Sequence, residues 1–193
     1  NQFTSVGEKG YKLEAEALEP LSKGMVACFA CPAHCRHRFM IDEGPYKGTR
    51  GEGPEYASIG SLGTKLGNLD LENIISAVEL CNRYGLDTIS TGSYLAWAME
   101  LYQRGILDRK KTGIPLEWGN GTTILKILEM IAHRKGFGDI LAEGSFARDM
   151  LGVSSRDYLL EIKGLPIEMT DERLPKSFAL GLATSTRGAC HMR

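Results

Sequence analysis

Three cysteines fall within eight residues of this chain, in the run Cys28-Phe-Ala-Cys31-Pro-Ala-His-Cys35. Thiolates at this spacing can converge on one side of a tight turn, which is how proteins present soft sulfur ligands to iron or zinc. A [4Fe-4S] cluster takes four protein sulfurs, so the run supplies three of them and the fourth must come from elsewhere. The other two cysteines of the chain are Cys81 and Cys190. The run therefore predicts an iron-sulfur site at its three cysteines.

Zinc and a disulfide are the alternatives to iron at this run. A Cys3His zinc site could use His34 or His37, but the chain has no second CxxC or HxxxH pair of the kind that usually completes a zinc knuckle. Five cysteines, three of them clustered, do not resemble the even-numbered framework of a secreted protein, and the first residues do not have the pattern of a signal segment. A structural role without metal remains the third possibility.

Composition limits the class of protein. With 193 residues and 42% hydrophobic content, the chain can bury a core as one large domain or two small ones. Lys and Arg (23) nearly balance Asp and Glu (24), so charge favours neither nucleic acid nor an anionic membrane as a partner. The apolar runs are shorter than the roughly 20 residues that span a bilayer, so we expect no transmembrane segment. Clustered thiols favour a reducing compartment, so we expect the cytoplasm.

Apolar periodicity predicts a mainly α fold with glycine-rich loops and few short strands. Asp70 can cap a helix whose apolar residues through Cys81 follow the 3.6-residue period, and Gly85 can end it. Cys81 then lies on the buried face of that helix. Three more helices are expected at 88–105, 122–136 and 139–152, and one strand at 158–163. The segment 40–67 and the residues from Gly164 onward are expected to be irregular.

Two loops carry groups suited to chemistry. The segment 50–56, Arg-Gly-Glu-Gly-Pro-Glu-Tyr, places Glu52 and Glu55 on a glycine-rich backbone, where a carboxylate can approach a ligand and carry a proton. Solvated surface carboxylates would have the same pattern. Near the end of the chain, Arg187 could hold a phosphate or carboxylate with two hydrogen bonds, and His191 could transfer protons.

Together these motifs resemble the tungsten-dependent aldehyde ferredoxin oxidoreductase family. The matching stretches, in this order along the chain, are CFACPAHC, GEGPEY, LCNRYGLDTISTG, GFGDILAEG and ATSTRGACHMR. The resemblance extends from Cys28 to Arg193. It implies a helical middle domain over 1–163, with a lead-in at 1–23, and the start of a C-terminal domain over 164–193. It also implies that the N-terminal pterin domain and the rest of the C-terminal domain are absent from this chain.

The resemblance assigns roles to individual residues. Cys28, Cys31 and Cys35 match the clustered ligands of a [4Fe-4S] cluster, whose fourth cysteine in the family would lie beyond Arg193, so neither of the other two cysteines matches it. Glu55 resembles the active-site glutamate of the family, and His191 resembles the active-site histidine of the family.

Further positions match the part of the family that binds a tungsten (or molybdenum) bis-pterin cofactor. The segment from Asn82 through Gly85 and Leu86 to Asp87 is similar to a pterin-binding loop, although the family pattern known to us has aspartate where this chain has Asn82. We group Arg187 with these cofactor-binding positions. Asp87 could equally serve only as the N-cap of the following helix, where a cap is worth about 1 kcal/mol.

The implied activity is oxidation of an aldehyde to a carboxylic acid, with electrons passed to ferredoxin or another low-potential carrier, in an oligomer. One branch of the family instead forms the catalytic subunit of a tungsten-dependent benzoyl-CoA reductase acting on an aryl-CoA, and the HCRHRF and EGPYKGTRGEGPEY stretches resemble that branch. A non-catalytic module that binds a cluster or acts as a scaffold is the alternative from a different class. A zinc hydrolase would need an open zinc with three protein ligands, for which the chain is poorly equipped.

Overall fold

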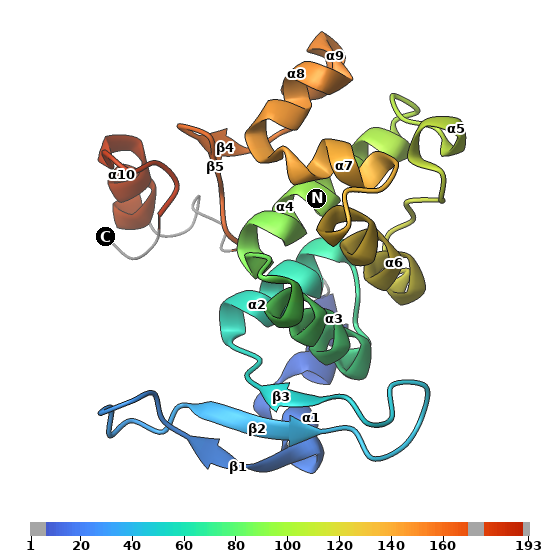
Figure 1. Ribbon diagram of the computed structural model, residues 1–193. Coiled ribbons are helices and arrows are strands. Elements are labelled where there is room, and N and C mark those ends of the chain that lie inside the picture. Colours follow the sequence, from blue (N-terminus) through green and yellow to red (C-terminus); the bar gives the residue numbers. More distant parts are fainter. Residues whose placement is uncertain (1–6, 170–175, 191–193) are drawn as a thin grey trace.

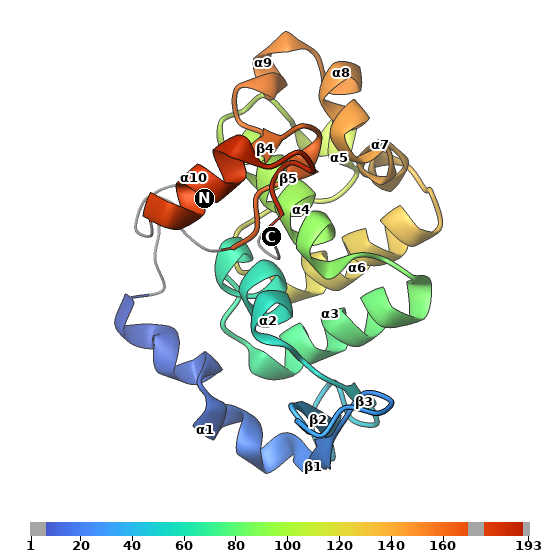
Figure 2. The same cartoon turned by 90° about the vertical axis from the view of Figure 1, so that its left-hand side faces the viewer.

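The computed structural model describes residues 7–169 and 176–190 of the chain. Helices form most of the described part, and the strands are short and few, so the expected mainly α class is confirmed. A body of helices occupies one end of the molecule and a small three-stranded sheet the other (Figures 1 and 2). The helices are α1 Ala15–Leu18, α2 Tyr56–Leu62, α3 Leu71–Tyr84, α4 Thr88–Gln103, α5 Arg109–Thr112, α6 Gly121–Ala132, α7 Phe137–Ala142, α8 Ala147–Leu151, α9 Val153–Arg156 and α10 Lys176–Thr184. The strands are β1 Ser22–Val26, β2 Arg36–Met40, β3 Arg50–Glu52, β4 Glu161–Ile162 and β5 Leu165–Pro166.

The core of the helical body is built by α3, α4 and α6, which lie together in both views. The expected start and end of α3 are confirmed: Asp70 accepts a hydrogen bond from the Asn73 N–H at 3.1 Å, and Gly85 ends the helix with a φ of 68°. Cys81 is fully buried, as its place in the apolar period predicts. Apolar residues surround α4 on all sides, because α4 lies at the centre of the helical body.

Helix α2 packs against α4 at very short range, although sequence analysis expected irregular backbone with short strands there. A Cβ atom at Gly92 would lie 2.4 Å from the Ser61 carbonyl oxygen, so only glycine allows the two helices to approach this closely. The many glycines of 40–67 suggested a loop, but the segment Tyr56–Leu62 has an apolar face that the body can bury. Tertiary packing therefore favours a helix here, although the surrounding sequence is rich in glycine.

Three other segments differ from expectation. The helix expected over 139–152 is divided into α7 and α8, because Gly144 takes a left-handed φ of 60° between them. The strand expected over 158–163 is reduced to β4, which pairs with β5 in a hairpin. The segment after Gly164, expected to be a loop, also contains α10.

The three-stranded sheet is antiparallel, in the order β1-β2-β3. A second, smaller apolar cluster joins the sheet to the helical body: Phe39 and Ile41 of the sheet segment pack with Leu71 and Ile75 of α3, and Leu18 of α1 completes it. The sheet is thus anchored on the same helix that forms the core, and α3 connects the two parts. Within 7–169 and 176–190, none of the helices has the length and apolar character needed to cross a membrane.

Candidate functional site

The cysteine run forms the turn between β1 and β2. Cys28, Cys31 and Cys35 are all exposed free thiols, and the turn is closed by a 3.0 Å hydrogen bond from the Cys31 N–H to the Cys28 carbonyl oxygen. Ala30 and His34 hold positive φ angles of 58° and 45°, which bends the backbone sharply at both places. Three exposed thiols on one bent turn are a donor set of the kind that soft metals and iron clusters require.

The structure does not gather these thiols into a finished metal site. Among residues 7–169 and 176–190, no group of three or more His, Cys, Asp or Glu side chains lies close enough together to hold a metal ion. The histidines of the turn have other partners: His34 Nδ1 donates to the Pro32 carbonyl oxygen at 2.9 Å, and His37 Nδ1 lies 3.0 Å from Ser22 Oγ. The ligand set of Cys28, Cys31 and Cys35 therefore stays a prediction.

The other two cysteines are in different surroundings. Burial, together with the nearby negative charge of Asp87, raises the pKa of Cys81 to about 12, so this residue remains a neutral thiol at physiological pH. Cys190 is also buried, and Arg187 Nη1 donates to its sulfur at 3.2 Å. A buried neutral thiol behaves as a small apolar side chain, so Cys81 belongs to the core.

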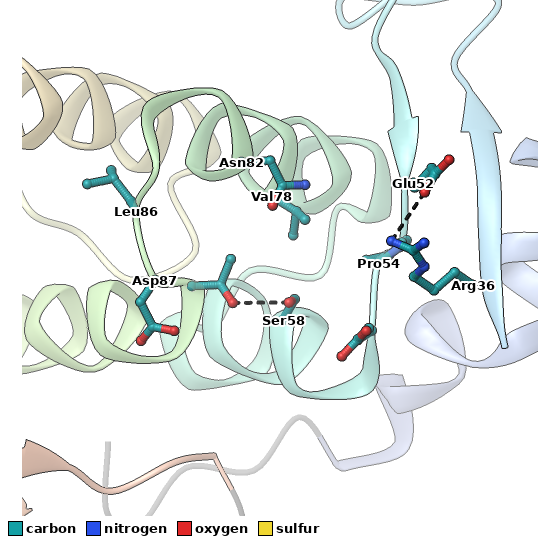
Figure 3. Close-up of a pocket in the computed structure, with 11 residues that line it drawn as sticks. Arg36, Glu52, Pro54, Ser58, Val78, Asn82, Leu86 and Asp87 are labelled. Atoms are coloured by element: carbon teal, nitrogen blue, oxygen red, sulfur yellow. Dashed lines mark hydrogen bonds and ion pairs between the residues drawn. The ribbon is translucent and has the colours of Figure 1, made fainter. Parts of the chain in front are cut away.

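A cleft of about 530 Å³ lies where the sheet meets the helices (Figure 3). Four segments form it: the start of β2, the end of β3 with the loop that follows, the first turns of α2, and the end of α3 with its connection to α4. Its lining residues are Arg36, Glu52, Gly53, Pro54, Glu55, Ser58, Val78, Asn82, Leu86, Asp87 and Thr88. The cavity thus brings a carboxylate expected to transfer protons together with three residues expected to bind the pterin, although they come from separate segments of the chain: Glu55, Asn82, Leu86 and Asp87.

Glu55 occupies the N-cap position of α2 without acting as a cap. Its backbone is extended, with a φ of -83° and a ψ of 159°, and its carboxylate makes no hydrogen bond to the first turn of the helix. The residue is exposed and lines the cleft. A carboxylate that is not used in capping is available to accept a proton from a ligand or a water in the cleft.

The segment Asn82 to Asp87 is the short connection between α3 and α4. The Leu86 N–H donates to the Cys81 carbonyl oxygen at 2.9 Å, closing the end of α3, and Gly85 supplies the left-handed residue that this ending requires. Asp87 Oδ2 accepts the Ser90 N–H at 2.7 Å, so Asp87 caps α4. Asn82, Leu86 and Asp87 line the cleft. Gly85 does not line it, and its role is to end α3.

Three polar residues of the cleft were missed by sequence analysis. Ser58 Oγ and Thr88 Oγ1 lie 3.1 Å apart and join the first turns of α2 and α4 (Figure 3). Arg36 Nη1 forms an ion pair with Glu52 Oε2 at 3.2 Å. Arg36 directly follows the last cysteine of the run and lies within the HCRHRF stretch, and these two signals in the sequence could have identified it.

The C-terminal residues are only partly described. His191 lies outside the described residues, so its expected place beside Glu55 stays a prediction. Arg187 is described but does not line the cleft, and its guanidinium faces Cys190 instead. Figures 1 and 2 show α10 on the side of the helical body where β4 and β5 lie, away from the three-stranded sheet. Of the predicted site residues, the cleft brings together Glu55, Asn82, Leu86 and Asp87.

Comparison with known proteins finds relatives that match the chain over its whole length. A family model described as aldehyde ferredoxin oxidoreductase, domains 2 and 3, matches residues 1–193. Tungsten-containing aldehyde ferredoxin oxidoreductases from Pyrococcus furiosus and Thermococcus kodakarensis are 42% and 40% identical to the chain, in matches that cover 100% of it and 32% of each relative. The chain therefore spans about a third of the length of these curated relatives.

Two further matches carry different names. A Pyrococcus furiosus protein called aliphatic sulfonate oxidoreductase, WOR-like subunit, is 33% identical over 86% of the chain and 28% of its own length. A solved structure, the active-site complex BamBC of benzoyl coenzyme A reductase with 1,5-dienoyl-CoA, superimposes with a TM-score of 0.70 over 88% of the chain and 25% of that protein. At 24% identity, this likeness shows the fold alone.

Proposed function

The chain belongs to the aldehyde ferredoxin oxidoreductase family, and on this premise we propose that it forms part of a tungsten-pterin, iron-sulfur oxidoreductase that oxidises aldehydes to carboxylic acids. The observation that carries the proposal is the cleft: it unites the carboxylate of Glu55 with Asn82, Leu86 and Asp87, and it adjoins the strand that begins directly after Cys35. The electrons released by this oxidation pass to ferredoxin or another low-potential carrier.

The side chains of the cleft suit a bound pterin. Asn82 offers an amide donor and acceptor, Asp87 keeps one carboxylate oxygen beside the one that caps α4, and Leu86 and Val78 provide apolar contact. A pterin ring has apolar faces and an edge of donors and acceptors, so these residues fit its chemistry. Cys28, Cys31 and Cys35 would hold three corners of the [4Fe-4S] cluster, with the fourth sulfur supplied from outside this chain.

The reaction defines what the protein residues must do. Conversion of an aldehyde and water to a carboxylic acid releases two electrons and two protons, and the tungsten-pterin group, when bound, accepts the electrons. Glu55 takes a proton from the reacting water at its free carboxylate, and His191 moves the second proton. Ser58 and Thr88 keep the first turns of α2 and α4 at a fixed separation, which holds Glu55 at a constant distance from the pterin-binding segment.

The division of the chain is part of the proposal. We assign 1–163 to the helical middle domain and 164–193 to the start of a C-terminal domain. The described part of the second segment contacts the first: Lys65 Nζ and Ser93 Oγ donate to the Ile167 carbonyl oxygen at 2.9 and 3.1 Å. These bonds tie the beginning of the C-terminal domain to α4 and to the 3-10 turn Thr64–Leu66.

The deciding experiment is anaerobic purification of the full-length protein that contains this chain, with elemental analysis and assays of both directions of catalysis. The expected result is iron and tungsten in stoichiometric amounts, released pterin, and aldehyde oxidation coupled to ferredoxin reduction. Iron without tungsten or pterin would show a cluster-binding module instead. Stoichiometric zinc without iron would contradict the cluster assignment.

Benzoyl-CoA reduction is the second candidate, favoured by the stretches His34–Phe39 and Glu43–Tyr56, which resemble the benzoyl-CoA reductase branch. Both candidates need the same cofactors, so metal content does not separate them. The assay does: a protein that reduces benzoyl-CoA with a low-potential donor, and shows no aldehyde oxidation, belongs to the second class.

A further inference from the structure

Arg36 is the one cationic residue among those that line the cleft, and nothing above gives it a function. It opens β2 immediately after Cys35, and Figure 3 shows its side chain extending from β2 toward the residues of α2 and α3 across the cleft. The residue therefore connects the strand that follows the cysteine turn with the cleft that Asn82 and Asp87 also line. A side chain in this position can contact a cofactor without belonging to the pterin-binding segment.

The hydrogen-bonding capacity of Arg36 is far from used. A guanidinium has five N–H donors, and its one recorded partner is the Glu52 carboxylate, 3.2 Å from Nη1. Nε is buried and has no hydrogen-bond partner among the described residues. Leaving a buried donor unpaired is unfavourable. A ligand acceptor that enters the cleft and pairs with the reoriented guanidinium removes this cost, which strengthens binding of that ligand.

The charge of the cleft selects the kind of acceptor. The described lining holds three carboxylates, those of Glu52, Glu55 and Asp87, and one guanidinium, so it carries a net negative charge. A phosphate brought into this cleft would meet more repulsion than attraction. A neutral heterocycle is favoured instead, because the carboxylates can accept from its ring N–H and amino groups while Arg36 donates to its carbonyl oxygen.

We propose that Arg36 is a cofactor-binding residue that donates hydrogen bonds to a ring carbonyl oxygen of the pterin in this cleft. The inference rests on the proposed function, since it requires that the cleft bind a pterin. Arg36 thus joins the cofactor to the strand that follows Cys35, and the ring rather than the phosphate of the cofactor lies in this part of the protein. The ion pair with Glu52 holds the guanidinium at the edge of the cleft.

The chain contains a matched control for this residue. Arg38 lies two residues further along β2 and also forms an ion pair with Glu52, with its Nε 3.7 Å from Oε1. Arg38 does not line the cleft. Replacing either arginine removes one positive charge and one contact to Glu52, so only a direct role in ligand binding should separate Arg36→Gln from Arg38→Gln.

The test compares wild type, Arg36→Gln, Arg36→Lys and Arg38→Gln in the full-length protein. Pterin retained after dialysis is measured by the fluorescence of the oxidised pterin released on denaturation, and iron is measured in the same samples. Loss of one charged hydrogen bond should make Arg36→Gln release pterin about 10- to 100-fold faster than wild type, with iron unchanged. Arg38→Gln should match wild type, and Arg36→Lys, which keeps the charge but not the planar fork, should be intermediate.

Equal pterin release in Arg36→Gln and wild type overturns the proposal, and so does equal loss in the Arg36 and Arg38 variants, which would show a role in the sheet alone. Parallel loss of iron and pterin in Arg36→Gln also contradicts it, because the effect would then pass through the cysteine turn. If Arg36→Gln does not fold, wild-type pterin release in Arg36→Lys decides against the proposal. A wild-type protein without any pterin would instead refute the proposed function.

Discussion

The helical body and the cysteine-bearing sheet are stabilised in opposite ways. The body around α3, α4 and α6 has a continuous apolar core in which residues such as Leu95 and Ile127 are fully buried. The sheet contributes only Phe39 and Ile41 to a smaller cluster, and the turn that carries its cysteines is exposed, with Phe29 entirely in solvent. The body therefore has an apolar core of its own, whereas the described residues of the cysteine turn contribute little to burial.

The cysteines show the same contrast at the level of single residues. Cys81 in the body is buried and its pKa is raised to about 12 by that burial, so it is a packing residue. The three thiols of the turn are free and exposed, so burial does not explain their presence. Thiols whose surroundings supply no packing are the ones available as ligands, and four predictions test this difference.

The largest expected effect is the complete loss of the cluster on replacing one cysteine of the turn. In the full-length protein, Cys31→Ser should abolish the broad visible absorption of an anaerobic preparation, because one of the predicted sulfur ligands is gone. Cys81→Ser is the control and should retain the absorption while lowering stability, since a hydroxyl replaces a buried thiol. Retained absorption in Cys31→Ser would break the contrast between the two regions.

Truncation of the helical core should have the next largest effect, on stability. Trp97 is 3% exposed and its Nε1 donates to the Ser155 carbonyl oxygen at 2.9 Å. Trp97→Ala should cost about 3–5 kcal/mol in the free energy of unfolding, measured by urea denaturation. Trp118 is only half-buried and donates to Gln103 at 2.8 Å near the surface, so Trp118→Ala should cost clearly less. Equal costs would show that the body lacks the compact core described above.

Proton transfer at the border between the two regions should change turnover without changing structure. Glu55→Gln should lower kcat about 100-fold or more, the usual contribution of a general acid or base, with iron and tungsten content unchanged. His191→Asn should have a similar effect if it shares the cavity. Turnover close to that of wild type in both variants, at full cofactor occupancy, would assign the proton transfers to other groups.

The smallest effect separates capping from cofactor binding. Asp70 caps α3 and Asp87 caps α4 in the same manner, but only Asp87 lines the cleft. Each change to alanine should cost about 1 kcal/mol of stability. Only Asp87→Ala should also reduce pterin content, as measured by fluorescence after denaturation. If both variants retain pterin equally, Asp87 is a cap and nothing more.

The sequence alone determined the features that depend on local chemistry. The period of apolar residues, Asp70 at one end and Gly85 at the other define α3 without reference to the rest of the molecule, because caps and amphipathic faces act within a few residues. The motifs likewise identified the family. The spacing of Cys28, Cys31 and Cys35 allowed them to converge on one turn. The three residues lie in the connection between β1 and β2, and their role as ligands stays a prediction.

Tertiary structure decided what depends on residues distant in the chain. The glycines of 40–67 predicted irregular backbone, yet α2 forms there because Gly92 of α4 lets the two helices approach closely. Arg36 and Thr88 lie within matching stretches that gave them no role, and Ser58 lies outside them. All three became site residues only when β2, α2 and α4 met at one cleft. A local pattern states what each segment can form, but the position of a cleft depends on how the segments pack, and packing energy is shared among residues that no short motif contains.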